Sequence, residues 1–164
     1  MGSTTSGRDR LPKPAMGNWR HLLAFGFGAG CSPRAPGTMG TLLAVALYLP
    51  LSRLSLVAYA LVLMAVTLAG IWLCGRAAQD LGVHDHPGIV WDEIAGYLLT
   101  MMAAPAGWPW IVIGFVLFRL FDVWKPWPIG WLDRRVQGGL GIMLDDLVAG
   151  VMAAVCLQML AAWV

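Results

Sequence analysis

The sequence predicts an all-α protein, a compact polytopic bundle of helices embedded in a membrane. Hydrophobic residues make up 59% and charged residues 12% of the 164 residues, whereas soluble domains carry about 25% charged residues. Mean hydropathy is +0.70. The apolar residues also gather in separate stretches, one of them long enough to span a bilayer. We therefore expect about four membrane-spanning or membrane-embedded helices, with a further N-terminal helix lying along the interface.

The elements follow one another from a polar start. Residues 1–17 contain Arg8, Arg10 and Lys13 without a following apolar run, which predicts a disordered basic leader before a single membrane domain over residues 18–164. A weaker helix is expected over residues 19–27. The apolar stretches then cover residues 38–51, 54–74, 94–104, 108–121 and 147–164.

The second of these stretches is the clearest span. Residues 54–74 contain no charge, and about 20 apolar residues cross a bilayer as a helix. The stretches at 94–104 and 147–164 reach a plausible length if the acidic pairs that precede them belong to the first turns of their helices. Whether the short stretches 38–51 and 108–121 cross fully or re-enter is left open by the sequence.

The distribution of charge predicts the orientation. Threading the helices through a bilayer leaves Arg53 as the only charged residue on one side. The other ten of the eleven Lys and Arg residues, and all nine Asp and Glu residues, fall on or near the opposite side. Because cytoplasmic loops carry the Lys and Arg excess, this opposite side is expected to face the cytoplasm.

Composition also limits the function classes. A net charge of +2, without a basic tract interleaved with aromatic residues, argues against nucleic-acid binding. The three cysteines, Cys31, Cys74 and Cys156, lack the spacing of a zinc site or of a Cys-x5-Arg phosphatase, because Gly37 stands where that arginine would be.

Five carboxylates lie at predicted helix ends on the cytoplasmic side: Asp92, Glu93, Asp122, Asp145 and Asp146. Held together without a cation, they would repel one another and their pKa values would rise. Hard divalent cations take carboxylate oxygens, and Mg²⁺ keeps water ligands that a substrate phosphate can replace. Each acid could alternatively be a solvated first-turn residue favoured by the helix dipole. Two acidic pairs and Asp122 on one side favour a metal site.

Candidate phosphate-binding residues occur on the same side. Arg34 and Thr38 flank the start of a predicted helix, and a glycine-rich segment precedes the last helix, where free backbone N–H groups could bind an anion. Arg119 lies one helical turn before Asp122. The set comprises Arg34, Thr38, Arg119, Lys125, Gly139 and Gly141. The glycines could instead form only a turn, and the basic residues could instead contact anionic lipid headgroups.

Several long motifs together resemble those of the phosphatidylglycerophosphatase A family, and the similarity covers roughly residues 21–160. They are Gly26-Phe-Gly-Ala-Gly30, Ser32-Pro-Arg-Ala-Pro-Gly-Thr-Met-Gly40, His84-Asp-His86, Ile89-Val-Trp-Asp-Glu93, Phe118-Arg-Leu-Phe-Asp-Val-Trp-Lys-Pro-Trp-Pro128 and Gly138-Gly-Leu-Gly-Ile-Met-Leu-Asp-Asp-Leu-Val-Ala-Gly150. The resemblance implies an all-helical, Mg²⁺-dependent lipid phosphatase of the bacterial inner membrane. Such an enzyme converts phosphatidylglycerophosphate to phosphatidylglycerol and phosphate.

These inferences combine into one hypothesis for the site. The five carboxylates hold Mg²⁺, which polarises the phosphoryl group and makes water more acidic. Arg34, Arg119 and Lys125 neutralise charge on the phosphoryl oxygens. Glu93 is the favoured general base among the catalytic candidates Asp92, Glu93, Asp122 and Asp146. Direct attack by water, and an aspartyl-phosphate intermediate on Asp122 or Asp146, both stay open.

Two other classes compete with a lipid phosphatase. A cation-coupled transporter or channel could use the same carboxylates, but it would need polar residues leading to the far side of the membrane. That half of the chain is almost wholly apolar. A structural membrane subunit would have no use for five clustered acids. The expected partners are the lipid substrate and the bilayer, with no nucleic acid and no obligate protein partner.

Overall fold

The computed structural model describes residues 11–84 and 86–163, and all of the regular structure in these ranges is helical. Residues 1–10 of the predicted leader, Asp85 of the His84–His86 motif and Val164 lie outside the described residues. The elements are α1 (Trp19–Ala24), the 3-10 helix η2 (Gly26–Cys31), α2 (Pro36–Leu51), α3 (Leu56–Leu81), α4 (Trp91–Thr100), α5 (Trp108–Trp124), α6 (Ile129–Arg135) and α7 (Gly138–Trp163).

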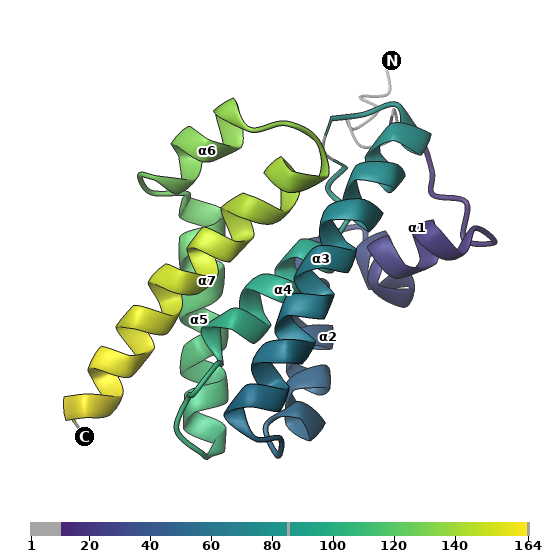
Figure 1. Ribbon diagram of the computed structural model, residues 1–164. Helices are drawn as coiled ribbons and strands as arrows, with labels where there is room; N and C mark the ends of the chain where they lie inside the picture. Colours follow the sequence, from purple (N-terminus) through teal and green to yellow (C-terminus); the bar gives the residue numbers. More distant parts are fainter. Residues whose placement is uncertain (1–10, 85, 164) are drawn as a thin grey trace, which may run out of the picture.

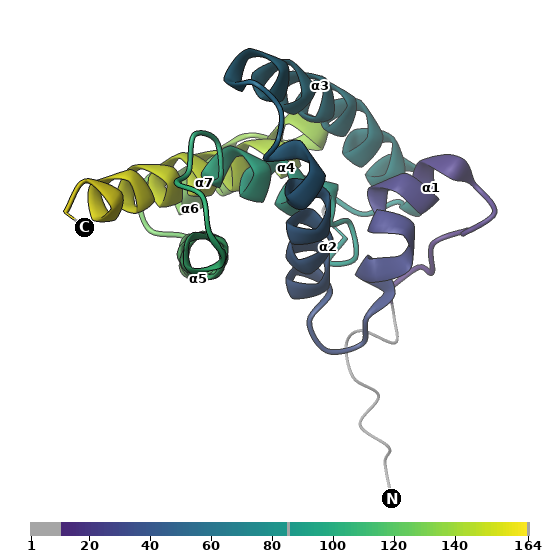
Figure 2. The same ribbon diagram turned by 90° about the horizontal axis from the view of Figure 1, so that it is seen from below.

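The short helix α4 lies at the centre of the molecule, where α2, α3, α5 and α7 all contact it (Figures 1 and 2). The end of α3, helix α6 and the start of α7 lie at one end of the molecule, the top of Figure 1. The α2–α3 and α4–α5 turns and the C-terminus lie at the opposite end. The first of these ends therefore includes Arg76 and Asp80 of α3 and Asp133, Arg134 and Arg135 of α6.

Within residues 11–84 and 86–163, two helices, α3 and α7, are long and apolar enough to cross a membrane. Each has 26 residues and is therefore about 39 Å long. Helix α2 is a shorter apolar helix. Helix α4 has 10 residues, about 15 Å, which is half of a hydrocarbon core of about 30 Å. Of the roughly four membrane-spanning or membrane-embedded helices expected, two among the described residues are long and apolar enough to span a bilayer.

The element boundaries correct several expectations. The acidic pair Asp92 and Glu93 does lie in the first turn of α4, but α7 begins at Gly138, so Asp145 and Asp146 lie two turns inside it. Helix α6 occupies a segment expected to be a loop. The helix expected over residues 19–27 is divided into α1 and η2, because Gly26, Phe27 and Gly28 have positive φ angles.

Exposed apolar side chains form stripes along the long helices. On α3 the stripe consists of Val57, Leu61, Met64, Leu68 and Trp72, which recur every three or four residues and so share one face. Helix α5 exposes Trp108, Val112, Val116 and Leu120, and α7 exposes Val151, Val155, Met159 and Trp163. Such surfaces are large for a water-soluble monomer, and they fit contact with lipid.

The buried core holds α4 in place. Tyr97 of α4 is fully buried, and its ring meets those of Tyr48 and Phe118 edge-on, with ring centroids 6.4 Å apart in each pair. The Tyr97 hydroxyl donates a hydrogen bond to the Ile111 carbonyl oxygen of α5 at 3.1 Å. Edge-to-face pairs of this kind contribute about 0.5–1.5 kcal/mol beyond the area they bury. The central helix is thereby fixed relative to α2 and α5.

Candidate active site

Three carboxylates converge where α4 crosses α7. One oxygen each from Asp92, Glu93 and Asp146 lies within 4.8 Å of the other two. Asp92 and Asp146 are buried, and the Glu93 side chain is 12% exposed. Asp122 and Asp145, which the sequence placed in the same metal set, do not belong to this group of three.

The crossing is close because glycines line it. A Cβ atom added to Gly96 would lie 2.7 Å from the Asp146 carbonyl oxygen, and one added to Gly150 would lie 2.5 Å from the Gly96 carbonyl oxygen. Real Cβ atoms do not approach other atoms so closely. The two glycines, each four residues after a carboxylate of the cluster, therefore let the backbones meet at the depth of the acids.

The cluster is electrostatically unfavourable without a cation. Burial, reinforced by the neighbouring Asp146 carboxylate, raises the pKa of Glu93 to about 8. The Oε2 atom of Glu93 is buried and has no hydrogen-bond partner among the described residues. A buried polar atom of this kind needs a partner, and a cation would satisfy it while favouring the ionised carboxylates.

Arg119 of α5 supplies positive charge beside the cluster. Its Nη1 atom lies 2.5 Å from Asp122 Oδ2 and 3.9 Å from Glu93 Oε1. The pairing with Asp122 spans one helical turn, as the sequence spacing predicts. Asp122 thus lies at the edge of the site as the partner of an arginine.

Lys125 forms a second charged group around Asp145. Its Nζ atom lies 2.6 Å from Asp145 Oδ2 and 3.2 Å from Asp133 Oδ1. Burial by itself would lower the pKa of Lys125, but the hydrogen bond to Asp145 and the two negative charges outweigh burial and raise it. Asp145 Oδ1 also accepts a hydrogen bond from the Asp146 backbone N–H at 3.1 Å. Asp145 therefore connects Lys125 to the residue that carries the third carboxylate.

The first turn of α2 reaches the site through a residue that sequence reasoning missed. A Cβ atom on Gly37 would collide with Glu93 Oε1 and lie 3.0 Å from Arg119 Nη1. Gly37 stands between the predicted residues Arg34, which is exposed in the preceding loop, and Thr38, which is half-buried in α2. The sequence did offer one indication that Gly37 belongs to the site, because this residue lies between two candidate residues of one motif.

The glycines at the start of α7 have close packing contacts. A Cβ atom on Gly139 would collide with the Ile71 carbonyl oxygen of α3, and one on Gly141 with the Val136 carbonyl oxygen. Both lie in the first turn of α7 rather than before it. Close packing accounts for glycine at both positions, and their predicted phosphate contact stays a prediction.

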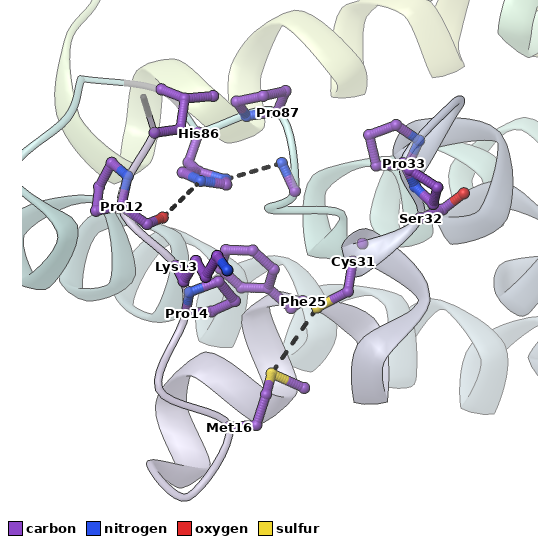
Figure 3. Close-up of a pocket in the computed structure, with 14 residues that line it drawn as sticks. Pro12, Lys13, Pro14, Met16, Phe25, Cys31, Ser32, Pro33, His86 and Pro87 are labelled. Atoms are coloured by element: carbon purple, nitrogen blue, oxygen red, sulfur yellow. Dashed lines mark hydrogen bonds between the residues drawn. The ribbon is translucent and has the colours of Figure 1, made fainter. Parts of the chain in front are cut away.

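A cavity of about 390 Å³ lies beside the start of α2. Figure 3 shows His86 on its wall, with Phe25 and the prolines of residues 12–14 around it. His86 Nδ1 accepts a hydrogen bond from the Gly88 N–H at 3.0 Å, and Nε2 lies 3.1 Å from the Pro12 carbonyl oxygen. These two contacts suit a neutral imidazole, so His86 holds the end of the predicted leader, at Pro12, against the body of the protein.

The cluster suits a hard divalent cation. Its donors are all carboxylate oxygens, which are the ligands that Mg²⁺ and Ca²⁺ prefer. The three oxygens lie within 4.8 Å of one another, so one ion bound between them could be held by all three carboxylates. The fold and site together define an all-α protein with a buried carboxylate centre suited to a metal ion.

Comparisons with known proteins identify the family. The profile of the family described as Phosphatidylglycerophosphatase A matches residues 22–161. The chain is 53% identical over 140 residues to Phosphatidylglycerophosphatase A of Escherichia coli (strain K12), covering 85% of this chain and 81% of the relative. It is 41% identical over 155 residues to Phosphatidylglycerophosphatase A of Haemophilus influenzae, covering 93% and 95% respectively. The chain belongs to the phosphatidylglycerophosphatase A family and is therefore a phosphatase, as its motifs predict.

A third relative carries a different substrate in its name. A protein of Bacteroides thetaiotaomicron, provisionally named a phosphatidylinositol-3-phosphatase, is 40% identical over 152 residues, covering 87% of this chain and 93% of the relative. Both names describe phosphatases that act on lipids. No solved structure matches the chain significantly.

Proposed function

We propose that this enzyme hydrolyses the terminal phosphomonoester of phosphatidylglycerophosphate, releasing phosphate and leaving phosphatidylglycerol in the membrane. The family supports this substrate, since relatives that are 53% and 41% identical bear the name of that activity. The observation that carries the site assignment is the convergence of Asp92, Glu93 and Asp146. A buried acidic cluster of this kind, beside an arginine, suits chemistry on a phosphate group.

The proposed cofactor is Mg²⁺, held by Asp92, Glu93 and Asp146. When bound, this ion would supply electrostatic polarisation of the phosphoryl group and offset the negative charge of the ligands. Asp122 and Asp145 contribute from outside the group of three, because each already pairs with a basic side chain. The buried oxygen of Glu93 without a hydrogen-bond partner among the described residues is the specific support for a cation here.

The basic residues have separate roles in this proposal. Arg119, next to Glu93, is placed to donate hydrogen bonds to phosphoryl oxygens as negative charge develops on them. The first turn of α2, with Gly37 and Thr38, offers backbone N–H groups to the same phosphate. Arg34, Lys125 and the start of α7 at Gly139 and Gly141 complete the proposed phosphate-binding set.

Glu93 is the proposed general base. With a cation bound in the cluster, Glu93 would be ionised, the form in which a carboxylate can accept a proton. In direct hydrolysis, Glu93 would take a proton from the attacking water as the water oxygen bonds to phosphorus and the bond between phosphorus and the lipid oxygen breaks; the leaving lipid oxygen would receive a proton from Glu93 or from solvent and depart as the alcohol. In the covalent route, the Asp122 or Asp146 carboxylate would attack phosphorus first, and water would then hydrolyse the aspartyl-phosphate.

The proposed location is the bacterial inner membrane, with several membrane passes and the active site toward the cytoplasm. From Asp146 to the end of α7 at Trp163 is 17 residue steps, about 26 Å along the helix. This length approaches the thickness of a hydrocarbon core of about 30 Å, so the carboxylates would lie at its edge. A lipid substrate could then keep its acyl chains in the bilayer while its phosphate enters the site. The excess of basic residues at this end supports the cytoplasmic side.

Phosphate release by the purified enzyme in detergent tests the proposal. We expect release from phosphatidylglycerophosphate with Mg²⁺, loss of release with EDTA, and recovery when Mg²⁺ is restored in excess. Phosphatidylinositol-3-phosphate should be tested in parallel because of the third relative. Release that persists in EDTA would refute the metal mechanism, and folded enzyme that turns over only the inositol lipid would refute the substrate.

A further inference from the structure

Two exposed tryptophans stack at the junction of α1 and α3. The rings of Trp19 and Trp72 lie 5.6 Å apart, inclined by 24°. The Arg20 guanidinium carbon lies 5.8 Å from the Trp19 ring centre and 5.5 Å from the Trp72 ring centre. The two residues are 55% and 44% exposed, so this cation–π cluster faces the surroundings of the protein rather than its core.

The cluster terminates an apolar surface. The exposed stripe on α3, which begins at Val57, ends at Trp72. One turn later on the same face stands Arg76, and a further turn brings Asp80, both exposed. The face changes from apolar to charged within a single turn at Trp72. Tryptophan and arginine at such a boundary are typical of the interface between hydrocarbon and headgroups.

The depth of Trp72 agrees with that of the active site. A Cβ atom on Gly70 would lie 2.7 Å from the Trp91 ring of α4 and 2.6 Å from Met143 Sδ of α7. Trp91 directly precedes Asp92, and Met143 lies one turn before Asp146. The Trp19–Trp72 stack and the carboxylate cluster are therefore at nearly the same level along the bundle, where the membrane surface is proposed to lie.

The positive charge of Arg20 at the Trp19–Trp72 stack favours binding of an anion. Arg20 has a single ion pair among the described residues, with Nη1 4.0 Å from Asp80 Oδ2, and Asp80 also lies 3.4 Å from His21 Nε2. The Arg20 side chain as a whole is 38% exposed. It therefore keeps donors for an external oxygen while the two rings hold its plane in position.

We propose that Trp19, Arg20 and Trp72 form a binding site for the net-negative headgroup of an anionic phospholipid of the surrounding bilayer, separate from the active site. Arg20 donates to the phosphate oxygens, Arg76 adds positive charge one turn further out, and the stripe on α3 receives the acyl chains. The inference rests on the proposed embedding in a membrane, and it does not depend on the phosphatase chemistry.

Native mass spectrometry of the full chain tests this site directly. The protein is equilibrated with mixed micelles of phosphatidylserine and phosphatidylcholine, which differ in net charge and are neither the proposed substrate nor its product. The readout is the ratio of the two lipids retained. Arg20→Gln should lower the preference for phosphatidylserine about fivefold, the effect of roughly 1 kcal/mol per basic residue at an anionic surface. Arg53→Gln, which removes the same charge at the opposite end, should leave the ratio unchanged.

Each outcome bears on the proposal. An unchanged ratio in Arg20→Gln, or equal losses in both variants, would overturn it. If Arg20→Gln does not fold, as judged by circular dichroism, Trp72→Leu takes its place, with the same loss expected and an unchanged ratio again contrary. Inorganic phosphate, compared with chloride at equal ionic strength, should not displace the lipid; selective displacement would assign the site to free phosphate. Because the readout is lipid retention and not activity, the result of this test does not depend on the outcome of the phosphatase assay.

Discussion

Lys125 Nζ lies 2.6 Å from Asp145 Oδ2, and this ion pair joins the end of α5 to the α7 turn that carries Asp146. Asp145 is buried, and its other oxygen accepts the Asp146 backbone N–H. Asp145 therefore orients the residue beside it, and Lys125 neutralises Asp145. The pair supports the geometry of the carboxylate cluster from outside.

Replacing Lys125 with Met should destabilise the protein and reduce turnover. Loss of a hydrogen bond between charged groups costs about 1.5–3 kcal/mol, and the partial exposure of Lys125 puts the expected loss at the lower end of this range. The apparent melting temperature in detergent and kcat measure the two effects. The double variant Lys125→Met with Asp145→Leu should recover part of the stability, because no uncompensated charge is then buried. Additive losses would show that the two side chains do not act as a pair.

The sequence predicted the helical class, and its spacing put Arg119 and Asp122 on one helix face, because these features depend on local composition and helical spacing. It grouped five carboxylates, whereas the structure brings only Asp92, Glu93 and Asp146 together among the described residues. Adjacent residues point about 100° apart on a helix; of the pair Asp145 and Asp146 only Asp146 joins the cluster, whereas Asp92 and Glu93 in the first turn of α4 both reach it. Which of Asp145 and Asp146 faces α4 depends on the packing of Gly96 against Gly150, and tertiary packing of this kind cannot be derived from one helix alone.

Boundaries near glycine and proline were the least predictable features of the fold. Residues 138–141 look like a turn because three of the four are glycines, yet α7 starts at Gly138. Contact with α3 at Gly139 stabilises this turn as helix, since tertiary packing overrides local propensity. Gly37 was likewise not predicted as a site residue, because its role is to leave room for Glu93 and Arg119.

Magnesium should stabilise the enzyme through Asp146. A ligand at a concentration 100 times its Kd raises the free energy of unfolding by about 2.7 kcal/mol, and this gain should appear as an upward shift of the melting temperature in detergent. Asp146→Asn should abolish both the shift and turnover, whereas Asp80→Asn, which lies outside the cluster, should retain both. A full magnesium shift in Asp146→Asn would exclude that residue as a ligand.

Arg119 should contribute to turnover through the geometry of its guanidinium group as well as through its charge. Removing a donor to a developing phosphoryl or oxyanion charge reduces kcat by about 10²–10³, so Arg119→Gln should lose at least about 100-fold. Arg119→Lys keeps the charge but lacks the fork that contacts Asp122 and approaches Glu93, and it should recover only a small part. Arg135→Gln on α6, which stacks on Trp131, provides the matched control. Near-normal kcat in Arg119→Lys would show that charge alone suffices.

The approach of α4 to α7 at Gly96 should be essential for both stability and activity. A Cβ atom there would lie 2.6 Å from the Phe118 ring and 2.7 Å from the Asp146 carbonyl oxygen. Ala is otherwise favoured over Gly inside a helix by about 0.5–1 kcal/mol, so an uncrowded position would gain stability on substitution. Overpacking typically costs about 1–3 kcal/mol, and we expect Gly96→Ala to lower the melting temperature on balance.

The same substitution should also lower kcat, because Asp92 lies one turn before Gly96 and would move away from Asp146. Gly17→Ala is the control, since nothing lies within 4 Å of a Cβ atom added at that position, and it should change neither quantity. If Gly96→Ala raised the melting temperature, the helices would have room to separate, and the cluster would not depend on their contact. If the melting temperature fell while kcat stayed unchanged, contacts other than the one at Gly96 would set the spacing of the carboxylates. The ion pair between Lys125 and Asp145 would then be the first of these contacts to test.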